Sequence, residues 1–144
     1  MKRAVIIEGD GIGPEVIASA VQVLEAVSPG LEMVEGCMGL QCHTRTGSYL
    51  PQSTIDLLND SDAALFGAIT SPADRADYRS PLLSLRKSMD LYANIRPVKR
   101  LHPSVGLVDL DVVIVRENTE GMYTGEEREV PGGIVTERKV TEYA

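Results

Sequence analysis

Residues 3–16 read RAVIIEGDGIGPEV, a stretch that combines a short apolar run, a glycine-rich turn and a proline. A nearly continuous apolar run of this kind is typical of a strand buried on both faces of a parallel sheet. Pro14 suits the first position of a helix, and Pro29-Gly30 ends the pattern that follows. That helix carries a one-sided set of apolar residues, Val16, Ala20, Val23, Leu24 and Val27. The stretch predicts strand, turn and helix in succession.

Similar signals recur along the rest of the chain. Further strands are predicted at residues 31–34, 63–69 and 111–115, the last two as buried strands. Helices are predicted from Pro51 through Leu58, and from Pro81 with Ser80 as its N-cap. The stretch around Gly39, Gly47 and Ser48 indicates a connecting loop. The alternation predicts an α/β fold, a mostly parallel sheet with flanking helices.

Residues 97–110 lack a periodic pattern and contain Pro97, Pro103 and Gly106. Composition leaves two interpretations open for this segment, a crossing between domains and an ordinary surface loop.

Composition excludes several classes of function. The chain has 14 basic and 21 acidic residues, a formal charge of -7, which repels a nucleic-acid backbone. No apolar run approaches the roughly 20 residues that span a bilayer, and the first residues do not resemble a signal peptide. We therefore expect a cytoplasmic protein that binds neither nucleic acid nor membrane.

Cys37 and Cys42 lie near His43, but a structural zinc site needs four ligands, so we expect reduced thiols and no metal site.

The glycine turn at residues 9–15 is not the dinucleotide fingerprint, because Pro14 stands where the third glycine is required. Its glycines indicate only that the backbone of this turn passes close to a neighbouring group. Another strand and a ligand are equally compatible with the pattern.

Three arginines occur beside apolar or uncharged neighbours, namely Arg86, Arg96 and Arg116. Arginine is costly near a core unless it has a partner. Arg116 directly follows the strand at 111–115, and the carboxyl ends of such strands are where ligands of open α/β sheets bind. Clustered guanidinium groups match planar carboxylates, so the pattern favours a small polycarboxylic acid as ligand. The alternative is that each arginine pairs with an acid of the protein, as Arg116 could with Glu117 or Glu120.

Tyr123 follows in the turn Glu120-Gly121-Met122-Tyr123. A phenol at this position could donate a proton to a carbanion or enolate. An isolated tyrosine is also a common packing residue.

Four motifs occur in a fixed order: residues 9–16 (GDGIGPEV), 66–72 (FGAITSP), 85–97 (LRKSMDLYANIRP) and 115–123 (VRENTEGMY). Together they resemble the successive signatures of the decarboxylating 3-hydroxyacid dehydrogenases, the isopropylmalate, isocitrate and homoisocitrate dehydrogenase family. The resemblance runs from residue 3 to the end of the chain.

The resemblance implies roles for individual residues. Arg86, Arg96 and Arg116 match the arginines that hold the malate moiety of the substrate, and Tyr123 matches a tyrosine that helps to protonate the enolate. Ile12, Thr70 and Ser71 match the nicotinamide-ribose side of the cofactor site. The family uses NAD or NADP together with Mg²⁺ or Mn²⁺.

The start of the arginine-bearing helix bears on the choice of substrate. Leu82 and Leu83 match apolar positions that pack on the isopropyl group of 3-isopropylmalate, whereas Ser80 matches an isocitrate-type serine. Arg79 departs from the glutamate of many isopropylmalate enzymes, and residues 116–123 are closer to the branch that includes homoisocitrate enzymes. We favour 3-isopropylmalate, the substrate used in leucine biosynthesis, with isocitrate and homoisocitrate as alternatives.

The resemblance also implies the amino-terminal part of a longer, homodimeric enzyme. Residues 1–98 would be the first portion of the cofactor-side domain, and residues 99–144 the start of the second domain, ending inside a helix at 135–144. The aspartates that bind the metal, a catalytic lysine and the loop that grips adenine would lie outside this chain. Two hypotheses follow: that the chain is part of a catalytic dehydrogenase, or that it is a short noncatalytic binding or subunit-interaction module.

Overall fold

The computed structural model describes residues 1–72, 78–106 and 108–142, with the side chain of Met122 left undescribed. The chain divides into two compact units, residues 1–85 and residues 86–144. The domain boundary between residues 98 and 99 that the family resemblance implies refers to the fold of the complete family members. The division at residues 85 and 86 does not test it, so this boundary stays a prediction.

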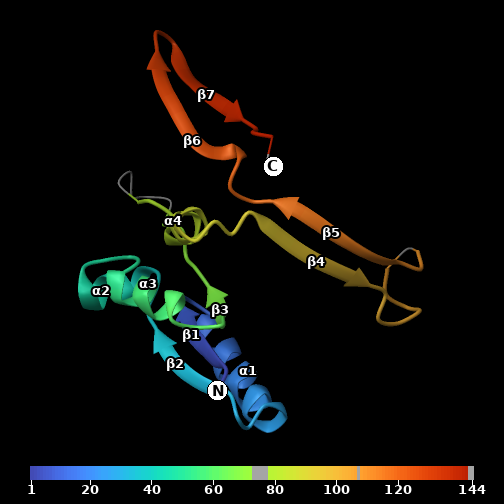
Figure 1. Ribbon diagram of the computed structural model, residues 1–144. Coiled ribbons are helices and arrows are strands. Elements are labelled where there is room, and N and C mark those ends of the chain that lie inside the picture. Colours follow the sequence, from blue (N-terminus) through green and yellow to red (C-terminus); the bar gives the residue numbers. More distant parts are fainter. Residues whose placement is uncertain (73–77, 107, 143–144) are drawn as a thin grey trace. The chain divides into compact units, whose positions relative to one another are not determined.

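The first unit is built on a parallel sheet in the order β2-β1-β3 (Figure 1). The strands are β1 (Arg3–Gly9), β2 (Glu32–Gly36) and β3 (Ala63–Ala68). Val5 and Ile7 of the central strand are 0% and 1% exposed, so β1 forms the core. Helix α1 (Gly13–Val27) connects β1 to β2 and packs on β1 and β3, with Ile17 buried against the sheet. The predicted strand, turn and helix are confirmed, as is the α/β fold class.

The sequence overestimates burial in two elements of this unit. Residues 63–69 were expected to form a buried strand, but β3 is an edge strand of the described sheet, with Ala63 and Ala64 exposed. On α1, the buried positions are Gly13 and Ile17. Of the predicted apolar set, Ala20 and Leu24 are half-buried and share the side of Ile17, whereas Val16, Val23 and Val27 are exposed.

The glycine turn passes close to another strand. Gly9 has a φ of +77°, and a Cβ at this position would overlap the carbonyl oxygen of Ala68 in β3. The amide of Asp10 donates a hydrogen bond to that same oxygen at 2.6 Å. A Cβ on Gly13 would overlap the carbonyl of Glu8. The close approach left open by the sequence is therefore an approach to protein backbone.

The segment expected as a loop around Gly39, Gly47 and Ser48 contains a short helix, α2 (Leu40–Thr46). Gly39 is its N-cap and Gly47, in the left-handed conformation with φ 78°, is its C-cap. The glycines thus mark the two ends of a helix, and the expectation of a loop was wrong. Helix α3 (Gln52–Asn59), which follows Pro51, confirms the predicted helix.

Cys37 and Cys42 form a disulfide, whereas reduced thiols were expected. The end of β2 and the first turn of α2 bring the two Cα atoms to 5.5 Å, within the range that a disulfide spans. Local spacing alone did not reveal this, because helix α2, which contains Cys42, was not predicted.

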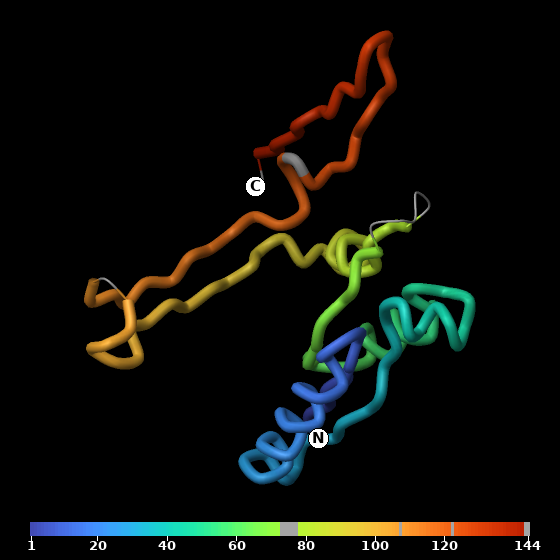
Figure 2. Tube along the Cα trace, turned by 180° about the vertical axis from the view of Figure 1, so that it is seen from behind, coloured from blue at the N-terminus to red at the C-terminus, as the bar shows by residue number. Residues whose placement is uncertain are grey.

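Two antiparallel strand pairs make up most of the second unit (Figure 2). Strand β4 (Ala93–Lys99) pairs with β5 (Asp111–Glu117), and residues 100–110 join them. The strand expected at 111–115 is present but not buried, since Val113 and Val115 are 61% and 68% exposed. In the described part of the chain β4 is the strand that pairs with β5.

The second pair is the hairpin of β6 (Gly121–Val130) and β7 (Gly133–Lys139). The expectation of a helix at 135–144 is wrong for residues 135–139, which lie in β7, and residues 143 and 144 lie outside the described residues. The turn after Pro131, with Gly132 at φ +92°, reverses the chain, and Ile134, Val135 and Thr136 are β-branched residues suited to a strand.

Candidate functional site

The predicted site residues occur in two groups within the two units. Arg86, Arg96, Arg116 and Tyr123 belong to the second unit, and Ile12, Thr70 and Ser71 belong to the first. Ser80, Leu82 and Leu83 lie at the start of α4 (Pro81–Ser88), the helix that contains the division between the units.

Strand register places two of the arginines on one face of the β4–β5 pair. Asn94 lies directly opposite Arg116, and Arg96 follows Asn94 by two residues. Because side chains alternate between the faces of a strand, Arg96 and Arg116 are diagonal neighbours on the same face. The Nε of Arg96 donates a hydrogen bond to Oδ1 of Asn94 at 3.1 Å.

Arg86 completes what we call the arginine cluster, Arg86, Arg96 and Arg116. It lies in the last turn of α4, and its carbonyl accepts a hydrogen bond from the amide of Leu91 at 2.8 Å. Burial lowers the pKa of the Arg86 guanidinium, and the positive charges of Arg116 and Arg96 lower it further. The positive charges of Arg116 and Arg96 therefore act on Arg86, an arrangement that an anionic ligand would relieve.

The acids nearest in sequence are engaged elsewhere. Glu117 accepts hydrogen bonds from the amides of Thr119 and Glu120, each at 2.7 Å, and from Oγ1 of Thr119 at 2.8 Å. Burial would raise the pKa of Glu117, but these hydrogen bonds outweigh it and hold the pKa below its usual range. Glu120 accepts from the amide and the hydroxyl of Thr141, each at 2.6 Å.

Arg116 therefore does not pair with Glu117 or Glu120, which was the alternative reading of the sequence. Among the ion pairs of the described residues, none includes a guanidinium of the arginine cluster.

Tyr123 lies beside Arg116 of the arginine cluster. Its amide donates to the carbonyl of Glu120 at 3.2 Å, so a tight turn sets its position at the start of β6. The Cζ of Arg116 lies 5.3 Å from the centre of the Tyr123 ring, within cation–π range. Lys87, which the sequence analysis did not single out, donates to the carbonyl of Thr124 at 2.7 Å and ties α4 to the same turn.

Ser80, Leu82 and Leu83 are half-buried, and Pro81 among them is buried. The hydroxyl of Ser80 accepts the amide of Leu83 at 3.5 Å, in keeping with its predicted capping position. Leu82 and Leu83 precede Arg86 by four and three residues, so they share its side of the helix.

Two loops of the first unit meet around Asp10, another residue that sequence reasoning missed. Asp10 is 2% exposed, and its carboxylate accepts the amides of Leu40, Gln41 and Thr70 at 2.9 to 3.0 Å. Ile12 is 62% exposed, and Thr70 is exposed as well. A Cβ on Gly11 would be 3.8 Å from Oγ1 of Thr70, which places the glycine turn against the loop after β3.

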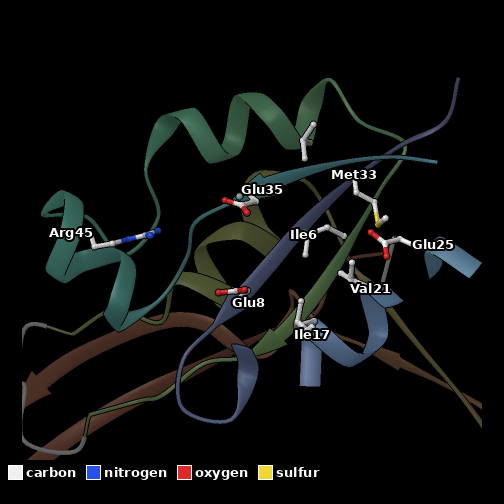
Figure 3. Close-up of a pocket in the computed structure, with 11 residues that line it drawn as sticks. Ile6, Glu8, Ile17, Val21, Glu25, Met33, Glu35 and Arg45 are labelled. Carbon is white, nitrogen blue, oxygen red and sulfur yellow. The ribbon is translucent and has the colours of Figure 1, made fainter. Parts of the chain in front are cut away.

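A hollow of about 310 Å³ lies between α1 and strands β1 and β2 (Figure 3). Apolar side chains, including Ile6, Ile17, Val21 and Met33, line it, and Glu8, Glu25 and Glu35 contribute carboxylates. The three carboxylates outnumber the one guanidinium of the lining, that of Arg45, so the net negative charge would repel an anionic acid or a dinucleotide phosphate. We therefore assign neither ligand to this hollow.

Two further observations concern the described residues as a whole. They contain no group of three His, Cys, Asp or Glu side chains that could hold a metal ion. No helix among them has the length and apolar character needed to cross a membrane.

Comparison with known proteins places these features in a family. The family model described as isocitrate/isopropylmalate dehydrogenase matches residues 3–143. A 3-isopropylmalate/3-methylmalate dehydrogenase of Methanocaldococcus jannaschii is 47% identical over 146 residues, which cover 100% of this chain and 42% of the relative. A homoisocitrate dehydrogenase of the same organism is 38% identical over 154 residues, covering 98% of this chain and 44% of the relative.

Solved structures agree. The isocitrate dehydrogenase of Methylococcus capsulatus superposes with a TM-score of 0.88 at 33% identity, covering 98% of this chain and 43% of that protein. The chain thus spans less than half the length of the relatives that it matches.

Proposed function

This chain belongs to the isocitrate/isopropylmalate dehydrogenase family, and on that premise we propose that it forms the substrate-binding part of an NAD(P)-dependent, decarboxylating dehydrogenase. The proposed substrate class is a 3-substituted malate. The single observation that carries the proposal is the arginine cluster, in which Arg116 lies beside Tyr123 and no guanidinium has an ion-pair partner among the described residues.

The arginine cluster has the chemistry that a polycarboxylic acid requires. A guanidinium presents paired N–H donors that match a carboxylate in bidentate fashion, and it stays charged at any physiological pH. Mutual repulsion in the free protein makes binding of a multiply charged anion more favourable, because the anion neutralises charges that otherwise oppose one another. A monocarboxylate would relieve less of this repulsion and should bind more weakly.

Tyr123 is the proposed proton donor. Loss of carbon dioxide from the oxidised acid leaves an enolate that must be protonated on carbon. The Arg116 guanidinium lies over the ring, and the amide of Tyr123 donates to the carbonyl of Glu120, which supports a role for the phenol next to the groups that bind the acid. Arg116 thus serves both to bind the substrate and to orient the donor.

Ile12, Thr70 and Ser71 are the proposed cofactor-side residues. The exposed Ile12 side chain offers an apolar surface for a nicotinamide ring, and Thr70 and Ser71 offer hydroxyls to a ribose. NAD or NADP, when bound, supplies the acceptor for the hydride that leaves C2 of the acid. The donor set for Mg²⁺ or Mn²⁺ is incomplete among the described residues, so we assign this chain no metal ligand and no step that depends on the metal.

We favour 3-isopropylmalate, and hence a role in leucine biosynthesis, because Leu82 and Leu83 share the side of α4 that carries Arg86. Apolar side chains there suit an isopropyl group better than a third carboxylate. Isocitrate and homoisocitrate remain alternatives, and both names occur among the relatives. We further propose a homodimer that acts in the cytoplasm, without nucleic-acid or membrane partners.

The test uses the product of the complete reading frame that contains this chain. Cofactor reduction is followed with NAD or NADP, Mg²⁺ and each of the three acids. We expect reduction with one of the acids, and 3-isopropylmalate to give the highest kcat/KM. Absence of turnover with every combination would contradict the dehydrogenase proposal and favour the noncatalytic binding module.

A further inference from the structure

We propose that Asp10 is a positioning residue that fixes the cofactor-side loop, residues 69–72, against the glycine turn that carries Ile12. The proposal rests on the proposed function, since it assumes that these two segments form the surface on which the dinucleotide lies.

The carboxylate of Asp10 joins segments that are far apart in the chain. Its Oδ2 accepts the amides of Leu40 and Thr70, both at 3.0 Å, and its Oδ1 accepts the amide of Gln41 at 2.9 Å. Two of these donors belong to the first turn of α2, and the third belongs to the loop after β3. One side chain therefore determines where both segments lie relative to the glycine turn.

The backbone of Asp10 reinforces the same connection. Its amide donates to the carbonyl of Ala68 at 2.6 Å, and its carbonyl accepts the amide of Gly13 at 2.8 Å. Ala68 is the last residue of β3, so the loop that begins there is attached to Asp10 twice, once before Thr70 and once at Thr70 itself. The start of α1 is attached to Asp10 through Gly13.

A buried carboxylate needs this many donors. Asp10 is 2% exposed, and an ionised group removed from water is costly unless hydrogen bonds replace its hydration. Its described partners are backbone amides, which donate but cannot accept. The carboxylate thus has the chemistry of a positioning group, and removing it would leave the amides of Leu40, Gln41 and Thr70 without their acceptor.

Asparagine cannot replace it fully. The Asn side chain has one acceptor oxygen, and its NH₂ group would face at least one amide donor. If the oxygen takes the Oδ2 position, the amide of Gln41 loses its acceptor; in the opposite orientation Leu40 and Thr70 lose theirs. We therefore expect Asp10→Asn to be intermediate between the wild type and Asp10→Ala.

The experiment compares Asp10→Asn and Asp10→Ala in the complete protein, with Asp62→Asn as the matched control. Asp62 is also a carboxylate that accepts a backbone amide, that of Arg3 at 2.9 Å, but its side chain is 40% exposed and it was assigned no role in the site. Binding of the reduced dinucleotide, NADH or, if the wild type uses NADP, NADPH (both called NADH below), is measured by fluorescence without the acid, and the KM of the acid is measured separately. Hydrogen exchange follows the amides of Thr70 and Val5.

We expect Asp10→Ala to weaken NADH binding about tenfold or more, which corresponds to ~1.4 kcal/mol, and to leave the KM of the acid within about twofold. The Thr70 amide should lose protection while Val5 in the core strand keeps it. Asp10→Asn should show smaller changes in the same direction, and Asp62→Asn none. A purely structural role would instead lower the amount of active enzyme without changing either constant.

Three other outcomes would overturn the inference. If Asp10→Ala retains its NADH affinity or its Thr70 protection while the wild type turns over an acid, the positioning role fails and the dehydrogenase proposal stands. Equal weakening of NADH and acid binding would also contradict a role confined to the cofactor side. A wild-type protein that binds no dinucleotide would remove both proposals together.

Discussion

Replacement of Gly39 by alanine tests whether the Asp10 carboxylate organises the first unit. Gly39 is the N-cap of α2, with φ 106° and ψ −164°, a conformation that is essentially confined to glycine and costs other residues about 1–3 kcal/mol. A Cβ at Gly39 would lie 2.5 Å from Oδ2 of Asp10 and 2.8 Å from both Cγ and Oδ1. The carboxylate must therefore move.

Moving the carboxylate weakens its hydrogen bonds to amides, and a hydrogen bond to a charged group contributes about 1.5–3 kcal/mol. Loss of one such bond plus the backbone strain predicts that Gly39→Ala lowers the free energy of unfolding by about 2.5–6 kcal/mol. Gly47→Ala is the matched control. Gly47 also has a positive φ, 78°, but no atom lies within 4 Å of a Cβ there, so the expected cost is about 1 kcal/mol.

Urea unfolding of the two variants, followed by circular dichroism, measures the difference. The double variant Asp10→Ala/Gly39→Ala should lose less than the sum of the two single losses, because both act on the same hydrogen bonds. If Gly39→Ala and Gly47→Ala destabilise the protein equally, or if the double variant is additive, the Cβ clash with Asp10 does not determine stability and the reasoning is refuted.

Two further predictions concern pH and redox state. The folded pKa of Glu117 is below its ordinary value of 4.5, so Glu117 stabilises the protein at neutral pH and this contribution disappears as the pH falls below that value. Unfolding measured against pH should show a smaller acid loss in Glu117→Gln than in the exposed control Glu127→Gln, and an equal loss in both would contradict the role of Glu117. Reduction of the Cys37–Cys42 disulfide opens a short loop and should cost about 2 kcal/mol. The double variant Cys37→Ser/Cys42→Ser should show no further change on reduction, and an undiminished response would contradict this assignment.

The parts of the fold that the sequence predicted are those with local signals. The apolar run at residues 4–7, the glycine turn and Pro14 lie next to one another, so β1 and α1 could be placed from them. The hairpin of β6 and β7 also has local signals, at residues 131–136, but the family resemblance suggested a helix there. Helix α2 was missed because its two capping glycines were taken as signs of a loop.

Burial and the site depend on contacts that no local pattern contains. The residues of 111–115 have the composition of a buried strand, but their side chains are exposed. In the described chain β5 belongs to a two-stranded sheet with β4. Residue type identified Arg96 and Arg116, but their common face results from the register of β4 and β5. Asp10 was missed because its partners are backbone amides 30, 31 and 60 residues away. Backbone amides do not depend on which side chain a residue carries, so the sequence gives no sign of these contacts.

The central claim is that the arginine cluster binds a polycarboxylic acid, and calorimetric titration of the complete protein with 3-isopropylmalate tests it most directly. Arg116→Lys keeps the charge but loses the paired donors, Arg116→Met loses both, and Arg138→Met removes the charge of an exposed arginine on β7 as a control. We expect affinity to fall about tenfold or more in Arg116→Lys and further in Arg116→Met, with Arg138→Met unchanged. Equal affinity in all four proteins would contradict the account.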